Sequence, residues 1–249
     1  MGYSTTLFKS AFDNKTHKRM DFQSFSALEA LLYTLSKRQL KGKRDAELIS
    51  PATYKTNTTR ANANVLTWAS WCAVDVDDVE IEGDLNAWVR NLVPGWRFIC
   101  YSTASSRSNQ PKFRLVFDLG EEIETDRIKH FWYALNKELG GIGDTQTKDL
   151  SRMYYIPATY DGANNFIFTG DGSSINVNEL LAKHPYVDRA KSGNTFLDRL
   201  PPELAEQVVN HRKNSMQNTN VVWSSFHDCP FWPRRLASEY LTISETGWY

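Results

Sequence analysis

The sequence has no net charge, few cysteines and no long apolar run, and each absence excludes a class of protein. Lys plus Arg and Asp plus Glu both number 29 in 249 residues, so the chain as a whole is not a strongly basic nucleic-acid binder. No apolar run approaches the roughly 20 residues of a membrane span, so we expect no membrane partner. The three cysteines are widely spaced, without a CxxC pair, which argues against a disulfide framework and a cysteine-rich zinc site. Their number and spacing indicate a reducing compartment, which we take to be the cytoplasm, or the host cytoplasm for a phage-encoded protein.

The histidines are equally uninformative as metal ligands. The five of them form no HxH or HExxH pattern, which disfavours a histidine-metal enzyme and a nuclease with paired histidines. The HDCP run at 227–230 is typical of a loop rather than of half a zinc site.

What is present predicts a folded protein with two oppositely charged parts. Hydrophobic residues make up 41% and aromatic residues 13% of the sequence, enough for a sizeable core. Residues 1–60 hold 11 basic and five acidic residues, a net charge of +6, so the remainder carries −6. Six carboxylates fall within 75–84. A basic arm beside an acidic focus indicates a polyanion held near a metal, although two solvated faces of opposite charge would give the same pattern.

The chain order of the predicted elements indicates a fold of the α+β class. Leucines at helical spacing after Ser26 and Glu29, which form a capping-box pattern, predict a first helix. Further on, apolar periodicity predicts strands over 71–77, 96–101, 112–119, 153–156 and 165–168, and helices over 85–93 and 124–139. The order from 71 to 156 is β-α-β-β-α-β, the split, ferredoxin-like or RRM-like arrangement, with two helices on one face of a four-stranded sheet and the other face free for a site.

Three domain-level segments are expected from these patterns. We expect 1–60 to be the basic N-terminal α/β extension, 61–187 the core, and 188–249 a linker with a small helical extension, with helices over 197–213 and 233–243. The chain ends in SETGWY, with two large aromatic residues last, so we expect it to be part of a longer protein.

Two predicted strands carry charged residues at a spacing of two. Asp75 and Asp77 leave one face of their strand, while Val74 and Val76 anchor the other. Two carboxylates held this close favour a hard divalent cation such as Mg²⁺ or Mn²⁺. Lys112 and Arg114 share a face of the strand expected beside it, where they suit a triphosphate. Either pair alone could also be a solvated strand face.

The segment 143–157 adds a third carboxylate. Asp144 follows a glycine-rich turn and Arg152 enters the next strand eight residues later. Asp144 would complete a metal site of the two-metal kind, and Arg152 could hold phosphates. Asp149 is the alternative third ligand, or a turn residue that binds nearby backbone amides.

These segments together resemble the archaeo-eukaryotic primase superfamily. AVDVDD at 73–78 looks like its first motif, KFRLVF at 112–117 like the strand of its second, and Asp144 to Arg152 like its third. The runs YSTASSRSNQPKFRLVF and DLSRMYYIP are most similar to primase-polymerases of phages and related mobile elements, and the likeness covers about 60–157. The second motif usually ends in a histidine, and here Arg114 stands in its place, so a proton-shuttle role is lost.

The resemblance implies a DNA primase-polymerase in phage or plasmid replication. Asp75, Asp77 and Asp144 would be the catalytic metal ligands, and Lys112, Arg114, Arg152 and Ser106 would bind the nucleoside triphosphate. The implied partners are single-stranded DNA template and primer, nucleoside triphosphates and a C-terminal helicase module. The basic residues of 1–60 would contact template phosphates, and Tyr54 is a candidate for stacking on a base. Two alternatives stay open, a non-catalytic single-stranded-DNA or origin-binding module on the same fold and a metal-dependent phosphoesterase.

Overall fold

The computed structural model describes residues 2–93, 95–144 and 148–186. The chain divides into two compact units, Met1–Val187 and Asp188–Tyr249. The helices predicted over 197–213 and 233–243 lie outside the described residues, all of which belong to the first unit. None of its described helices is long and apolar enough to cross a membrane.

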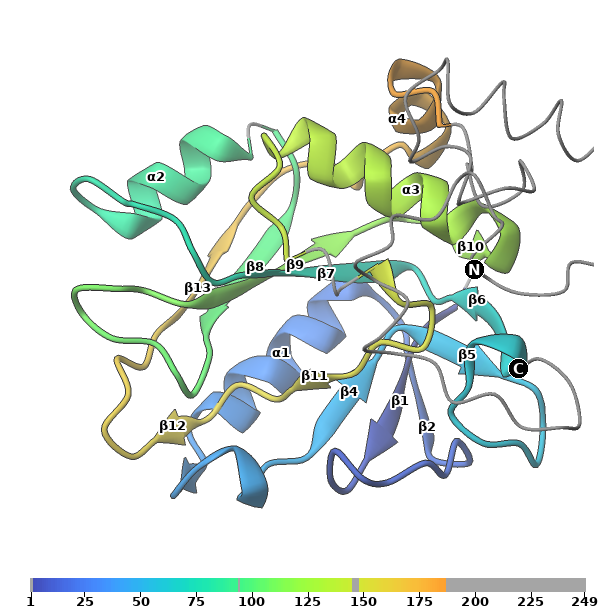
Figure 1. The fold of residues 1–249 in the computed structure, drawn as a ribbon, viewed down its shortest axis with the longest axis horizontal. Helices are drawn as coiled ribbons and strands as arrows, with labels where there is room; N and C mark the ends of the chain where they lie inside the picture. Colours follow the sequence, from blue (N-terminus) through green and yellow to red (C-terminus); the bar gives the residue numbers. More distant parts are fainter. Residues whose placement is uncertain (1, 94, 145–147, 187–249) are drawn as a thin grey trace, which may run out of the picture. The chain divides into compact units, whose positions relative to one another are not determined.

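The first unit is of the mixed α+β class, as predicted, and contains several sheets (Figure 1). Its described α-helices are α1 (Phe25–Ser36), α2 (Leu85–Leu92), α3 (Thr125–Glu138) and α4 (Val177–Lys183). The strands of the N-terminal part are β1 (Tyr3–Phe8), β2 (Arg19–Phe22), β3 (Gln39–Leu40), β4 (Leu48–Ser50), β5 (Ala52–Tyr54) and β6 (Val65–Trp68). The later strands are β7 (Trp71–Val76), β8 (Phe98–Ser102), β9 (Phe113–Asp118), β10 (Ile123–Glu124), β11 (Tyr154–Tyr155), β12 (Thr159–Tyr160) and β13 (Ile167–Gly170).

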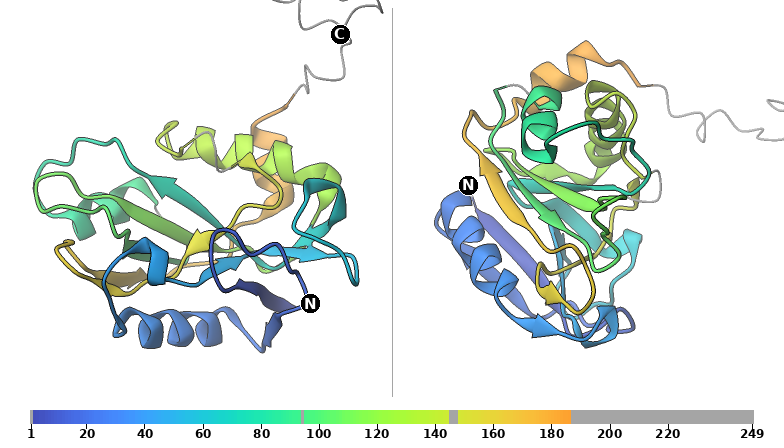
Figure 2. Two further views of the ribbon diagram at one scale, coloured as in Figure 1. Left: turned by 60° about the horizontal axis from the view of Figure 1, so that its bottom comes forward. Right: turned by 90° about the vertical axis from the view of Figure 1, so that its left-hand side faces the viewer.

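Two four-stranded antiparallel sheets dominate the unit. The central sheet has the order β13-β8-β9-β7, and the N-terminal sheet has the order β11-β4-β1-β2. Smaller sheets join β10, β6 and β5, and β12 with β3. Helices α2 and α3 lie on one side of the central sheet, and α1 and the N-terminal sheet lie on the other (Figures 1 and 2).

The split β-α-β-β-α-β arrangement is followed only in part. The strands β7, β9 and β8 are neighbours in the order this arrangement requires. The strand that should close the sheet beside β7, β11, instead pairs with β4 of the N-terminal sheet, through Tyr154↔Ile49 and Tyr155↔Leu48. The fourth place in the central sheet is taken by β13, at the opposite edge beside β8. The expected order of the sheet was therefore wrong at its edge.

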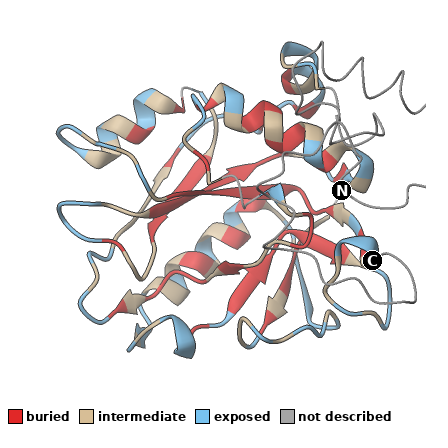
Figure 3. Cartoon of the chain, in the orientation of Figure 1, coloured by how far each residue is buried: buried red, intermediate tan, exposed pale blue. Residues whose placement is uncertain are grey.

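The second face of the central sheet is covered rather than free. The face toward α2 and α3 buries Val74, Val76, Leu115 and Phe117 in one apolar cluster. The other face buries residues such as Trp71 and Ile99 against α1, β4 and β11 in a second cluster. All six residues of β7 and all six of β9 are consequently buried, as Figure 3 shows for the centre of the unit. A site on this face can open only where the second cluster ends.

The first helix forms where predicted, but its capping box does not. Ser24, not Ser26, is the N-cap residue, and its side chain makes no capping hydrogen bond. Ser26 and Glu29 instead accept hydrogen bonds from Arg97 Nη2, at 2.9 and 3.0 Å. The two side chains therefore tie α1 to the start of β8, because a cation entering from another element is a stronger partner than the local amide.

Candidate active site

Asp75 and Arg114 form a buried ion pair in the central sheet. They are direct cross-strand partners in the register of β7 and β9, which confirms that the two predicted charged strands are adjacent. Arg114 Nε donates to Asp75 Oδ1 at 2.6 Å, and the two residues are 5% and 7% exposed. Charges this well buried persist only when they are paired, so each side chain fixes the other.

The remaining contacts of Arg114 are also with protein groups. Its Nη1 donates to the Tyr101 hydroxyl at 3.1 Å and to the Tyr155 carbonyl at 2.7 Å. Its guanidinium carbon lies 4.7 Å from the centre of the Tyr154 ring. Burial opposes the charge, yet Asp75 beside it raises the pKa of Arg114 above its ordinary value. Burial also disfavours the charged form of the two tyrosines, and it therefore raises the pKa values of the Tyr101 and Tyr154 hydroxyls. This environment holds Arg114 charged and in one orientation.

Arg152 brings the first and third motifs together. Its Nη2 lies 3.6 Å from Asp75 Oδ2 and 4.0 Å from Asp144 Oδ2. The backbone N–H of Asp144 donates to the Asp75 carbonyl at 2.9 Å, which places this loop directly beside β7. Gly143 allows that approach, because a Cβ there would lie 2.7 Å from Val74 Cγ1 and from Asn136 Oδ1. Two carboxylates thus share one cationic group.

Asp77 and Lys112 lie at the exposed end of the same strands. Lys112 Nζ is 3.9 Å from Asp77 Oδ1 and 3.9 Å from Asp78 Oδ1. The Asp77 side chain is 42% exposed and that of Asp78 is 88% exposed, so these contacts are loose. They still leave Asp77, Lys112 and the Asp75 cluster at one end of the central sheet.

A cavity of about 160 Å³ opens beside these residues, and Lys112, Asp78 and Asp144 are not part of its described lining. Its charged lining comprises Asp75, Asp77, Arg114, Arg152 and Lys43. Lys43 lies on a short 3₁₀ helix (Lys43–Asp45) of the N-terminal part, and no motif placed it at this site. Thr103, which follows β8, also lines the cavity. We call this space the smaller cavity.

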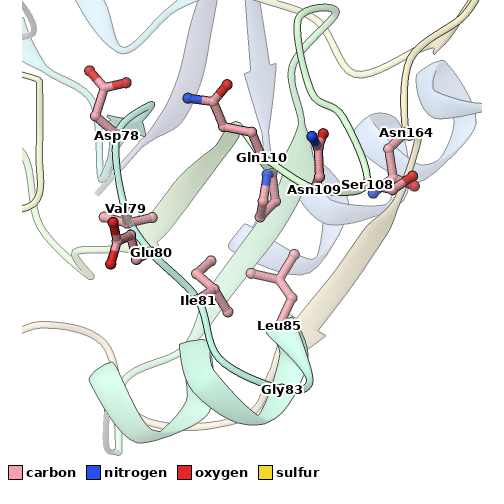
Figure 4. A pocket seen from close by; sticks show the side chains of 11 residues that line it. Asp78, Val79, Glu80, Ile81, Gly83, Leu85, Ser108, Asn109, Gln110 and Asn164 are labelled. Atoms are coloured by element: carbon pink, nitrogen blue, oxygen red, sulfur yellow. The ribbon is translucent and has the colours of Figure 1, made fainter.

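A second cavity, of about 660 Å³, has Asp78, the residue after Asp77, in its lining. It lies between the loop that leads from β7 to α2 and the loop that leads from β8 to β9 (Figure 4). Amide side chains, carboxylates and aliphatic groups line it, among them Glu80, Ile81, Asn109 and Gln110. None of the described residues in this lining is Lys or Arg, so the larger cavity has no cation for a phosphate group.

The carboxylate oxygens of the smaller cavity are the kind of ligand that a hard divalent cation prefers, but they are not arranged around a common point. Within the described part of the chain, no three His, Cys, Asp or Glu side chains are close enough together to hold a metal ion. The Arg152 guanidinium, however, lies within 4.0 Å of two of the three predicted carboxylates. A position that attracts this cation between carboxylate oxygens is one that Mg²⁺ or Mn²⁺ would also favour. The residues therefore fit such an ion, provided that Arg152 moves away.

Three other sequence candidates are placed differently. Ser106 is fully buried, and its Oγ accepts a hydrogen bond from the Lys112 N–H at 3.2 Å, so it shapes the turn before β9. Asp149 accepts a hydrogen bond from the Ser151 hydroxyl at 3.4 Å, on the segment that leads to Arg152. Tyr54 packs edge-on against Phe8 with ring centres 6.4 Å apart, and burial raises the pKa of its hydroxyl to about 12. Asp144 and Asp149 are the two candidates for the third metal ligand. Of these, Asp144 is the one whose backbone N–H donates a hydrogen bond to the Asp75 carbonyl.

Comparison with known families gives one match that spans more than half of the chain. Residues 52–191 match the family model described as the VapE N-terminal domain. The chain belongs to this family. The match supports the resemblance to phage and plasmid primase-type domains that the three motifs indicated, and it covers all of them.

Other comparisons add little to the VapE N-terminal domain assignment. One solved structure, the AEP domain of the cyanophage S-2L primase-polymerase (PrimPol), is 13% identical, with a TM-score of 0.44 over 73% of this chain and 89% of that chain. No curated protein sequence matches.

Proposed function

We propose that this VapE N-terminal domain is the catalytic domain of a DNA primase-polymerase, which performs template-directed, metal-dependent nucleotidyl transfer during phage or plasmid replication. The observation that carries the proposal is the convergence on one cavity of carboxylates and cations from three separate motifs. Arg152, between the carboxylates of Asp75 and Asp144, is the centre of that convergence. Polymerisation needs both groups, because cations neutralise the triphosphate while carboxylates hold metal ions.

Asp75, Asp77 and Asp144 would hold Mg²⁺ or Mn²⁺. When bound, such ions lower the pKa of an attacking hydroxyl and stabilise charge on a leaving pyrophosphate. Asp75 is oriented for this role by its 2.6 Å contact with Arg114. We therefore assign Arg114 a positioning role through Asp75, in addition to the phosphate-binding role that its motif predicts.

Lys112 and Arg152 supply the positive charge that faces the substrate. Both are partly exposed, with 24% and 27% of their side chains accessible, unlike Arg114. Each is held by loose contacts of 3.6–4.0 Å with carboxylates, which an incoming anion and cation could replace together. Arg152 would exchange its carboxylates for phosphate oxygens as the carboxylates take up metal.

The template would be held by the basic residues of the N-terminal part. Lys41, Arg44 and Lys55 are exposed, as a phosphate-contacting residue must be. Contacts of this kind make binding of single-stranded DNA weaken steeply with salt. A helicase module in a longer protein and a primer strand are the further partners proposed.

The experiment is incubation of the protein with primed and unprimed single-stranded template, Mn²⁺ and labelled nucleotides. We expect primer extension, de novo primers or both. Binding of DNA without incorporation would instead indicate an origin-binding module, and cleavage of the template a phosphoesterase.

A pair of neighbouring variants shows whether the activity belongs to this site. Asp77→Asn removes a proposed metal ligand at the mouth of the smaller cavity and should reduce incorporation at least about 100-fold. Asp78→Asn is the matched control, because its side chain is 88% exposed and lines only the larger cavity. It should retain most of the activity. Equal loss in both variants would contradict the assignment.

A further inference from the structure

We propose that Thr103, Lys43 and Arg152 form the subsite of the smaller cavity that binds the nucleotide's phosphate groups. This inference rests on the proposed function and specifies where the substrate's negative charge is held. It adds Thr103 and Lys43, which none of the three motifs contains, and it leaves Ser106 to its place in the turn.

Thr103, which lines the smaller cavity, has an unused hydroxyl. Its Oγ1 is buried and has no hydrogen-bond partner among the described residues, although Thr103 lines the smaller cavity. Its backbone is fixed, because its N–H donates to the Lys112 carbonyl at 2.9 Å. A buried hydroxyl without a partner costs free energy, which a ligand that accepts its hydrogen bond would recover.

Arg152, which also lines the smaller cavity, has a second unused donor. Its Nε is buried and has no partner within the described part of the chain, while its Nη2 lies near the carboxylates of Asp75 and Asp144. Its backbone is also fixed, since its carbonyl accepts a hydrogen bond of 2.6 Å from the Ser50 hydroxyl. An O–H and an N–H that both lack acceptors match a ligand made of acceptors only, and phosphate oxygens are of that kind.

Lys43 adds the charge that selects an anion over a neutral acceptor. It reaches the smaller cavity from the N-terminal part of the chain, and it is exposed. No described ion pair within 4.0 Å engages it, whereas Lys112 is paired with Asp77 and Asp78. The larger cavity offers no comparable cation in its described lining, so the smaller one is the place for the phosphates.

Calorimetric titration of the 249-residue protein with inorganic triphosphate, in the presence of a chelator, tests the subsite without any catalytic step. We expect the wild-type protein to bind and Thr103→Val to bind at least about 10-fold more weakly, because the isosteric methyl group cannot donate. Thr103→Ser restores a hydroxyl and should recover most of the affinity. Thr103→Val should melt no lower than the wild type, since the hydroxyl that it loses has no partner within the described part of the protein.

Matched variants separate this subsite from general surface charge. Lys43→Gln should weaken triphosphate binding about 3- to 10-fold, a loss that shrinks at high salt. Lys129→Gln, at an exposed position on α3 outside the cavity lining, should change it less than about twofold. Thr34→Val, at an exposed position on α1, should have no effect.

The outcomes distinguish the subsite from the proposed function. Absence of triphosphate binding in the wild type, or equal binding by wild type and Thr103→Val, would overturn the subsite whether or not the protein extends primers. Weakened binding by Thr103→Val and Lys43→Gln together with absence of nucleotide incorporation would leave the phosphate subsite in place and refute the polymerase.

Discussion

The buried pair of Asp75 and Arg114 gives a sharp prediction about stability. Arg114→Met keeps the length and apolar bulk of the side chain but removes its charge and leaves Asp75 Oδ1 without its 2.6 Å partner. Breaking a buried pair on one side costs about 3–5 kcal/mol. Arg152 still lies 3.6 Å from Asp75 Oδ2, so we expect a loss of about 3 kcal/mol, at the lower end of that range.

The same loss should not occur at an exposed pair of equal length. Arg38 Nη1 is 2.7 Å from Glu47 Oε2, but the two side chains are 43% and 50% exposed. Arg38→Met should therefore cost at most about 1 kcal/mol. The comparison isolates burial, because the two contacts differ little in distance.

Urea denaturation followed by tryptophan fluorescence and circular dichroism measures both variants. A double-mutant cycle with Asp75→Asn completes the test, and the two changes together should cost at least about 2 kcal/mol less than the sum of the single losses. Equal losses for Arg114→Met and Arg38→Met, or additive losses in the cycle, would refute the reasoning that burial makes this pair strong.

Other contacts give three further predictions. Gly143→Ala should lower stability by about 1–3 kcal/mol and reduce nucleotide incorporation, because the added Cβ would lie 2.7 Å from Val74 Cγ1, beside Asp144. Gly42→Ala is the control, since a Cβ there would have nothing within 4 Å, and it should be close to neutral in the same assays. Glu138 accepts hydrogen bonds from Lys183 and His184, which hold its pKa below the ordinary value of 4.5. The contribution of ionised Glu138 to stability is therefore fully present above about pH 4.5 and is lost as the pH falls through the lowered pKa. Glu138→Gln should cost about 0.5–1 kcal/mol of unfolding free energy at pH 7 and nothing once Glu138 is protonated in the wild type. Denaturation at several pH values measures the difference. Cys72 and Cys100 are buried and burial raises their thiol pKa values, so neither should react with a thiol reagent until the protein unfolds.

The sequence predicts which charged strands are neighbours better than it predicts the edges of the sheet. Alternation along two strands was enough to expect Asp75 beside a cation of the neighbouring strand, because side-chain direction has a period of two. The pairing of β11 with β4 could not be expected, since apolar residues specify that a strand is buried but not which edge it joins. Because this pairing was not expected, it was also not expected that the second face of the central sheet is covered and that Arg114 is buried.

Lys43 and Thr103 mark a different limit of sequence reasoning. Lys43 is one of several basic residues in 1–60, and only the folded chain shows that it, rather than Lys41, lines the smaller cavity. Thr103 lies in a run of small polar residues that the sequence alone does not distinguish from one another. What distinguishes it is a hydroxyl that is buried without a partner among the described residues, a property that arises from packing and has no sequence signal.

The central claim, that metal ions and nucleotide phosphates meet in the smaller cavity, is tested most directly by a crystal structure of the protein with Mn²⁺ and a non-hydrolysable nucleoside triphosphate. Anomalous scattering locates the manganese independently of any assumed position. We expect manganese bound by carboxylates of Asp75, Asp77 and Asp144, with phosphate oxygens beside Arg152, Thr103 and Lys43. Manganese bound elsewhere, or a triphosphate ordered in the larger cavity, would contradict the claim.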